Sequence, residues 1–251
     1  MAAEDEISAA LRGTNTAQAG AEGVSVVEMR LCFGCFDGNS GRLEGRNGAG
    51  QQLFAADIAQ VLGSIPCFTA QSLVATGSGL VQVGSLTPGL RVITRDHGMQ
   101  ELRWVGKRTF GWKDLGLNPL LRPVRIAAGA LGNGLPERDM VVSPNHHFLT
   151  SKSGEGEGGE RLTMARDMVG RPGITTEICS SIEYWQLLFD KHELVLSDGC
   201  WSETFLPTTR NLAALDDDGR QSALIAVPDL QGGESASYEA ARPFAKVGSA
   251  A

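Results

Sequence analysis

The sequence has little of several features that would assign it to a class at once. Among its 251 residues, aromatics make up only 6%, and no apolar run reaches the 18 residues expected of a membrane-spanning helix. Lys and Arg number 22 against 29 Asp and Glu, and the net charge of −7 argues against a surface for nucleic acid or anionic membranes. The acidic start, residues 1–6, is followed by no apolar segment, so we expect no Sec signal peptide.

Cysteines are also few, and their number is odd. Five cysteines in a chain of this length do not indicate a disulfide framework. We therefore expect reduced thiols in the cytoplasm, or export by a signal-peptide-independent route. Cys32 and Cys35 have the spacing of a redox pair or of half a zinc site, but no second pair follows. The sequence thus predicts no metal site and no cofactor.

Glycine, by contrast, is abundant, with 32 residues, and this favours turns and short strands. Short apolar runs alternate with turn residues through the middle of the chain, which predicts an all-β domain. We expect one helical turn at 164–169 and a long connection at 107–121. Strands are expected at 73–76, 80–83, 90–94, 99–105, 124–128, 139–142, 148–151, 182–189, 193–196 and 201–206.

The two ends of the chain differ from this middle part. Residues 1–23 are rich in Ala, Gly, Thr and acids and are interpreted as a mobile arm with one weak helix. After it we expect a strand within 24–36, a loop over 37–51 and an amphipathic helix over 53–62. Beyond Pro207 the composition becomes polar, with one strand expected at 223–227. The domain prediction is an N-terminal extension at 1–64, a β domain at 65–207 and a C-terminal tail at 208–251.

Three residues in the β domain suggest thiol chemistry. Cys67 stands at the start of the domain, Ser143-Pro144-Asn145-His146 lies near its middle, and His192 belongs to a late strand. A thiol can attack the carbonyl carbon of the preceding residue, here Pro66, to give a thioester. Histidine titrates in the range needed to move the protons of such a step.

This arrangement, together with three further blocks, resembles the hedgehog/intein (Hint) family, most closely its bacterial subgroup. The blocks are Trp104-Val105-Gly106, residues 129–139 and Glu203-Thr204-Phe205-Leu206-Pro207, and the resemblance covers roughly residues 65–207. It implies an all-β fold of intertwined β subdomains and an autoprocessing activity.

The resemblance also implies roles for individual residues. Cys67 would be the nucleophile, and His146 would contact the scissile amide nitrogen and supply its proton. Ser143 would orient the scissile peptide or donate to its carbonyl oxygen, and His192 would assist the acyl shift. The neighbouring His147 receives no role.

The sequence departs from the family at the end of the domain. Inteins finish with His-Asn, and the Asn cyclises to release the domain, whereas Glu203 and Thr204 stand at this point. We therefore expect cleavage of the Pro66–Cys67 bond without completed splicing. The chain's own N-terminal segment would be the substrate, and an unidentified nucleophile would accept the acyl group.

Two other functions stay open. Gly84 and Leu90 stand where the family usually has acidic residues, which is compatible with a catalytically inactive β module that binds another protein. The second is a metal-binding module that uses Cys32 and Cys35 with distant ligands.

Overall fold

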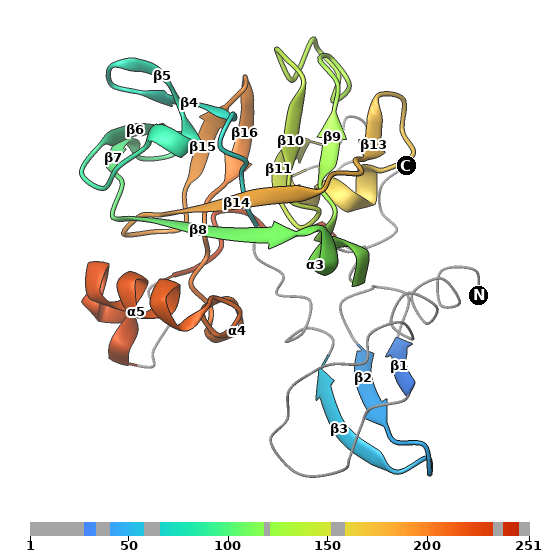
Figure 1. The fold of residues 1–251 in the computed structure, drawn as a ribbon. Coiled ribbons are helices and arrows are strands. Elements are labelled where there is room, and N and C mark those ends of the chain that lie inside the picture. Colours follow the sequence, from blue (N-terminus) through green and yellow to red (C-terminus); the bar gives the residue numbers. More distant parts are fainter. Residues whose placement is uncertain are drawn as a thin grey trace.

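The described chain folds mostly into short antiparallel strands (Figure 1). The structure is a computed structural model that describes residues 28–33, 41–57, 66–117, 121–151, 159–232 and 238–245. Within these residues, no helix has the length and apolar character needed to cross a membrane. The strands are β1 (Glu28–Phe33), β2 (Gly41–Arg46), β3 (Gln52–Asp57), β4 (Leu73–Thr76), β5 (Gly79–Gln82), β6 (Arg91–Thr94), β7 (Gly98–Glu101), β8 (Trp104–Gly111), β9 (Val124–Ile126), β10 (Met140–Val142), β11 (His147–Ser151), β12 (Glu160–Met164), β13 (Ile174–Thr176), β14 (Ser181–Leu188), β15 (Leu194–Ser197) and β16 (Cys200–Glu203), and the α-helices are α3 (Trp112–Leu117), α4 (Thr209–Ala213) and α5 (Asp217–Ala226).

The largest sheet joins strands from both ends of the β domain. Its order is β12-β11-β16-β15-β4-β6-β7, with β5 paired to β4 and an additional pairing between β15 and β6. The tight hairpins use glycine where the chain needs positive φ, as at Gly79 (φ 108°) and Gly98 (φ 67°). The early strands β4 and β6 therefore each pair with the late strand β15.

Strands β8 and β14 form a separate pair that runs across the larger sheets (Figure 1). β14 carries a residue that lies beside the candidate site. The two strands pair antiparallel from Trp104 opposite Leu188 to Gly111 opposite Ser181. Gly106 lies opposite Gln186, and a Cβ at Gly106 would overlap the Trp104 ring and lie 2.7 Å from Gln186 Oε1. Only glycine leaves room for both side chains at this point.

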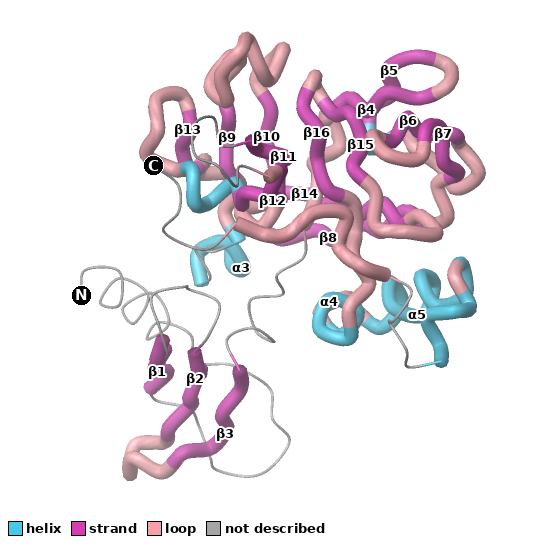
Figure 2. Tube along the Cα trace, turned by 180° about the vertical axis from the view of Figure 1, so that it is seen from behind, coloured by secondary structure: helices cyan, strands magenta, loops and turns pink. Residues whose placement is uncertain are grey.

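The segment after the β domain packs against the β8–β14 pair (Figure 2). Asp216 caps α5 by accepting a hydrogen bond from the Gly219 amide at 2.7 Å, and the buried Ala223 faces the core. Trp104 Nε1 donates to Ser222 Oγ at 2.8 Å, which ties α5 to β8. The strand expected at 223–227 is therefore wrong, because these residues lie in or directly follow a capped helix.

Most of the expected strands of the β domain are confirmed, as is the turn of helix, which is a 3-10 turn at Ala165–Met168. The connection expected over 107–121 is wrong in part, because β8 continues to Gly111 in pairing with β14 and α3 follows. The strands β12 and β13 were not anticipated. Both are short pieces that become strands by pairing with β11 and β9.

Ahead of the β domain, two expectations are wrong and others lie outside the described residues. The loop expected over 37–51 contains β2, and the helix expected over 53–62 begins instead with β3. β2 pairs with β1 on one side and β3 on the other, so ladder hydrogen bonds outweigh the loop-like composition and the helical spacing. The arm at 1–23 and residues 58–65 are outside the described part of the chain.

Candidate active site

Cys67 is placed by the pairing of its neighbour Phe68 between two strands. The Phe68 and Trp185 amides each donate to the other's carbonyl at 2.9 Å, and Phe68 also bridges Val142 at the end of β10. Cys67 is thereby buried, with 3% of its surface exposed, beside β14 and the turn that follows β10. This turn carries Ser143.

Ser143 binds both backbone polar groups of Cys67. The Cys67 amide donates to Ser143 Oγ at 2.9 Å, and the Ser143 amide donates to the Cys67 carbonyl at 3.0 Å. Ser143 was expected to orient the scissile peptide, and the structure brings it to the nitrogen of the peptide between Pro66 and Cys67. The same hydroxyl also bonds to the cysteine side chain.

The sulfur of Cys67 has a hydrogen-bond donor of its own. Gln186 is the residue after Trp185 on β14, and its Nε2 donates to Sγ at 3.0 Å. Burial raises the pKa of the Cys67 thiol to about 12, and the negative charge of Glu203 acts in the same direction, while the bonds from Gln186 and Ser143 oppose it. The resting sulfur is therefore a thiol at neutral pH.

His146 lies in the same turn but makes no bond to Cys67. Its amide donates to the Ser143 carbonyl at 3.1 Å, and its ring packs edge-on against Phe68 and Phe148, with centroids 4.5 and 5.0 Å away. Among the described residues neither ring nitrogen has a hydrogen-bond partner. Burial lowers the pKa of His146 to about 3, so the ring is neutral at pH 7. The expected contact with the Cys67 nitrogen is not made, because Ser143 takes that position.

A second cluster forms around the buried carboxylate of Glu203 on β16. His147 contacts it through both its backbone amide, at 3.0 Å, and its Nδ1 atom. His192 Nε2 lies 3.7 Å from the other carboxylate oxygen. Burial alone would raise the pKa of Glu203, but the charge of His147 and the hydrogen bonds of both histidines hold it well below its usual range.

His192 belongs to this cluster and not to the immediate surroundings of the thiol. Its Nε2 lies 3.2 Å from the Thr204 carbonyl oxygen, and its Nδ1 accepts a hydrogen bond from the Ala241 amide at 2.9 Å. Because Nδ1 accepts, the ring proton lies on Nε2, where it faces the carbonyl of Thr204. The two clusters are coupled by charge, since Glu203 affects the pKa of both Cys67 and His146.

Three residues of the site were missed by the sequence analysis: Gln186, His147 and Glu203. Gln186 was inside an expected strand, but nothing in the local pattern ties it to a cysteine 119 residues away. Glu203 carried a usable signal, since a charged residue in a short apolar strand requires a buried partner. His147, directly after His146, is the partner that meets this requirement.

No metal centre accompanies these clusters: the described residues contain no group of three His, Cys, Asp or Glu side chains placed to hold an ion. Cys32 lies in β1, and Cys35 lies outside the described residues. The metal-binding interpretation of this pair stays a prediction.

The family model described as "Hint domain" matches residues 66–209. Among solved structures, the chain is similar to the bacterial intein-like domain from Clostridium thermocellum, with 14% identity over 55% of this chain and 97% of that chain and a TM-score of 0.39. It is also similar to a DnaB intein from Synechocystis sp. PCC 6803, with 11% identity over 56% of this chain and 98% of that chain and a TM-score of 0.33. A search of curated proteins found no match.

The match of the family model extends over more than half of the chain and begins at Pro66, one residue before the buried thiol. The all-β fold and the intertwined sheet order are those expected of such a domain. This chain belongs to the Hint-domain family.

Proposed function

We propose that this Hint domain cleaves its own chain between Pro66 and Cys67. The observation that supports the proposal most strongly is the pair of hydrogen bonds between Ser143 and the backbone of Cys67. The first fixes the amide that must break and places a hydroxyl on its nitrogen, and the second holds the peptide that follows it. The N-terminal segment that ends at Pro66 is then the substrate of the domain.

The first step is an N-to-S acyl shift. The Cys67 sulfur bonds to the Pro66 carbonyl carbon, the bond from this carbon to the Cys67 nitrogen breaks, and the proton lost by sulfur is balanced by one gained at nitrogen. In the tetrahedral intermediate the nitrogen acquires a lone pair, and Ser143 Oγ, 2.9 Å away, is placed to pass a proton to it and to take up in exchange the proton lost by sulfur. The product is a thioester with a free amine on Cys67.

Gln186 contributes at the sulfur. Its amide cannot accept the thiol proton, but its N–H at 3.0 Å stabilises negative charge on Sγ as the proton leaves. Burial places the resting thiol pKa at about 12, so the reaction needs a transient base. His146 is the candidate, because its neutral ring has a free lone pair and the charge of Glu203 favours its protonated form.

The second step is cleavage of the thioester by an external nucleophile, such as water, a thiol or an amine. The nucleophile adds to the Pro66 carbonyl and the Cys67 thiol leaves, which restores the free thiol. Splicing does not follow, because Thr204 has no carboxamide to cyclise. Its hydroxyl also donates to the Glu193 carbonyl at 2.9 Å and accepts from the Glu193 amide at 3.0 Å.

The test is the intact mass of the freshly purified full chain, with and without hydroxylamine or dithiothreitol. We expect release of residues 1–66 and a second product that begins at Cys67 and keeps its C-terminal segment. Cys67→Ala should abolish the release, while Cys200→Ala, at a buried packing position, should not. An unchanged mass for well-folded protein overturns the proposal, and a peptide joining residues upstream of Cys67 to those beyond Leu206 overturns cleavage without splicing.

A second candidate function is a catalytically inactive β module that binds another protein. The observation that favours it is the resting state of the thiol, which burial keeps protonated and which receives its hydrogen bond from a group unable to take up a proton. The same mass measurement separates the two, since an inactive module stays intact.

A further inference from the structure

The described residues 238–245, here called the C-terminal strap, lie along the edge strand β12 and beside the Glu203 cluster. The Leu162 amide donates to the Pro243 carbonyl at 3.0 Å, and the Ala245 amide donates back to the Leu162 carbonyl at 2.9 Å. At the other end, the buried Tyr238 hydroxyl donates to the Phe189 carbonyl at 2.8 Å. The strap is thus fixed at both ends to the β domain.

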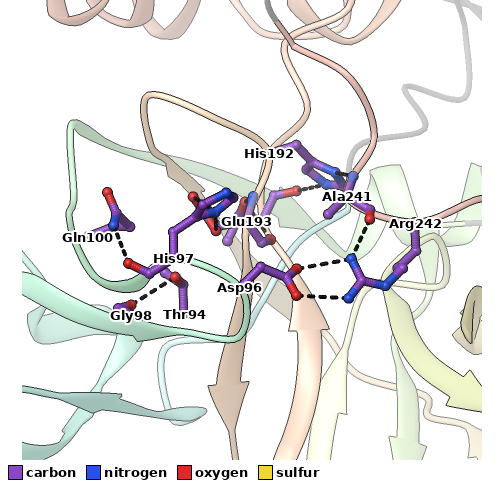
Figure 3. Close-up of polar contacts among 10 residues, drawn as sticks. Thr94, Asp96, His97, Gly98, Gln100, His192, Glu193, Ala241 and Arg242 are labelled. Atoms are coloured by element: carbon purple, nitrogen blue, oxygen red, sulfur yellow. Dashed lines mark hydrogen bonds and ion pairs between the residues drawn. The ribbon is translucent and has the colours of Figure 1, made fainter.

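Arg242 holds the middle of the strap. Its guanidinium donates to both carboxylate oxygens of Asp96, at 2.8 and 3.0 Å (Figure 3). Through Nε it also donates to Glu160 at 2.8 Å. The hydrogen bonds from Arg242 lower the pKa of Asp96. A fork that binds two carboxylates, one of them through both oxygens, fixes direction as well as position, and Lys cannot reproduce it.

The strap contacts both histidines that flank Glu203. The Ala241 amide, next to Arg242, donates to His192 Nδ1 at 2.9 Å (Figure 3). The Phe244 ring packs edge-on against His147, with centroids 4.9 Å apart. One short segment, distant in sequence from the β domain, therefore touches the two side chains that hold the buried carboxylate.

We infer that the C-terminal strap is a positioning element of the site, with Arg242 as its latch and the Ala241 amide as the group that sets the tautomer of His192. A neutral imidazole has one N–H, and a donor facing Nδ1 leaves that proton on Nε2. The Nε2 proton then faces the Thr204 carbonyl, 3.2 Å away, and the Glu203 carboxylate. Release of the strap removes this constraint, because Nδ1 is then free to carry the proton.

His97, in the turn between β6 and β7, also pairs with a buried group on this side of the site. Its Nδ1 lies 3.0 Å from the buried carboxylate of Glu193, one residue after His192 (Figure 3). Asp96, the partner of Arg242, is the preceding residue of the same turn. Asp96, which binds the latch, and His97, which binds Glu193 beside His192, therefore both belong to the turn between β6 and β7.

The test uses the full chain with 15N-labelled histidine side chains, in which NMR reports which ring nitrogen of His192 carries the proton. In the unmodified protein we expect Nδ1 to be unprotonated. Arg242→Ala should give a mixture of both tautomers, and Arg242→Lys a partial return. Arg220→Ala is the matched control, because Arg220 pairs with the exposed Asp217 on α5 and should leave the His192 signals unchanged.

The effect on cleavage rests on the proposed function and is measured separately. Arg242→Ala should slow release of residues 1–66 by roughly tenfold or more. This is part of the contribution of a positioned acid–base group, which is about 100-fold or greater. If the unmodified chain does not cleave, the proposed function fails, while the His192 tautomer still decides the role of the strap. An unchanged tautomer in Arg242→Ala overturns the inference even if cleavage proceeds. Should that variant not fold, Ala241→Pro removes the donor and leaves Arg242 in place, and it must give the same mixture of tautomers.

Discussion

Ser143 and Cys67 face each other across 76 residues of sequence, and Ser143 contacts the amide, the carbonyl and the thiol of Cys67. Its hydroxyl accepts from the Cys67 amide at 2.9 Å, and its own amide donates to the Cys67 carbonyl at 3.0 Å. The peptide plane before the cysteine is therefore oriented by a side chain from β10's end. The stability of the fold and the proposed cleavage therefore both depend on this contact.

Replacing Ser143 with Ala should destabilise the fold by about 1–3 kcal/mol, because the buried Cys67 amide loses its acceptor. Urea unfolding followed by fluorescence measures this free energy. The control is Ser202→Ala, also buried, whose hydroxyl has no hydrogen-bond partner among the described residues and whose loss should cost little. Equal losses of stability in the two variants would contradict the assignment.

Replacing Gln186 with Leu removes the donor to the Cys67 sulfur. The pKa of the thiol should rise above its present value of about 12, because this hydrogen bond lowers it. Hydroxylamine-induced cleavage should slow by roughly fivefold, corresponding to about 1 kcal/mol for one hydrogen bond. Gln82→Leu, at an exposed position of β5, serves as the control and should cleave at the normal rate. Faster cleavage in Gln186→Leu would show that the bond restrains the sulfur instead of activating it.

Glu203→Gln should lower the free energy of unfolding at pH 7 by about 1.5–3 kcal/mol, because the buried amide and ring of His147 lose the charged acceptor of their hydrogen bonds. The folded-state pKa of Glu203 is depressed, so its contribution is present above the unfolded value of about 4.5 and is lost as the pH falls below it. The variant should therefore lose less stability than the unmodified protein below pH 4.5. Urea titrations from pH 7 to 3 measure this, and Glu183→Gln, in the exposed pair with Lys107, should follow the unmodified curve.

His146→Leu should make the protein more resistant to acid while it abolishes cleavage. The folded pKa of about 3 lies below the ordinary value of 6.5, so the unfolded chain binds one more proton between these limits. As the pH falls through this range, this residue therefore lowers the free energy of unfolding by about 1.4 kcal/mol per pH unit. The variant lacks this dependence. Cleavage at the normal rate in His146→Leu would remove His146 from the mechanism.

Gly106→Ala should unfold the β8–β14 pair or displace Gln186 from the sulfur, because the added methyl group overlaps the Trp104 ring and lies 2.7 Å from Gln186 Oε1. We expect a loss of at least about 1–3 kcal/mol by thermal or urea unfolding. Gly111→Ala on the same strand has its nearest atom at 3.8 Å and is the matched control. An equal tolerance of both substitutions would contradict the described packing.

The β domain could be predicted from sequence because its strands are marked by local patterns that agree with their environment. The hairpins of β4–β5 and β6–β7 combine alternating residues with glycine in the turns, and both were expected. The flanking elements were predicted less well, since β2 and β3 take their structure from pairing with neighbours and α5 from a capping Asp and burial of one face. These causes lie outside any short window of residues.

The candidate site was also predicted in part. Cys67 and Ser143 were expected to cooperate, and the structure brings them into contact, while the roles assigned to them stay predictions. His192 was expected near the thiol but binds the Glu203 cluster and the strap. Gln186 could not be identified from local sequence, because its role depends on the Cys67 sulfur, which is 119 residues away in the chain.

The closing of the β domain by its last strands has a consequence for the nascent chain. Gln186, the donor to the sulfur, is made 119 residues after Cys67, so at about 5–20 residues per second the thiol waits roughly 6 to 24 s for it on the ribosome. Long-range pairing of this kind also forms slowly. Through this delay, the segment ahead of Cys67 has time to fold before the site proposed to cleave it is complete.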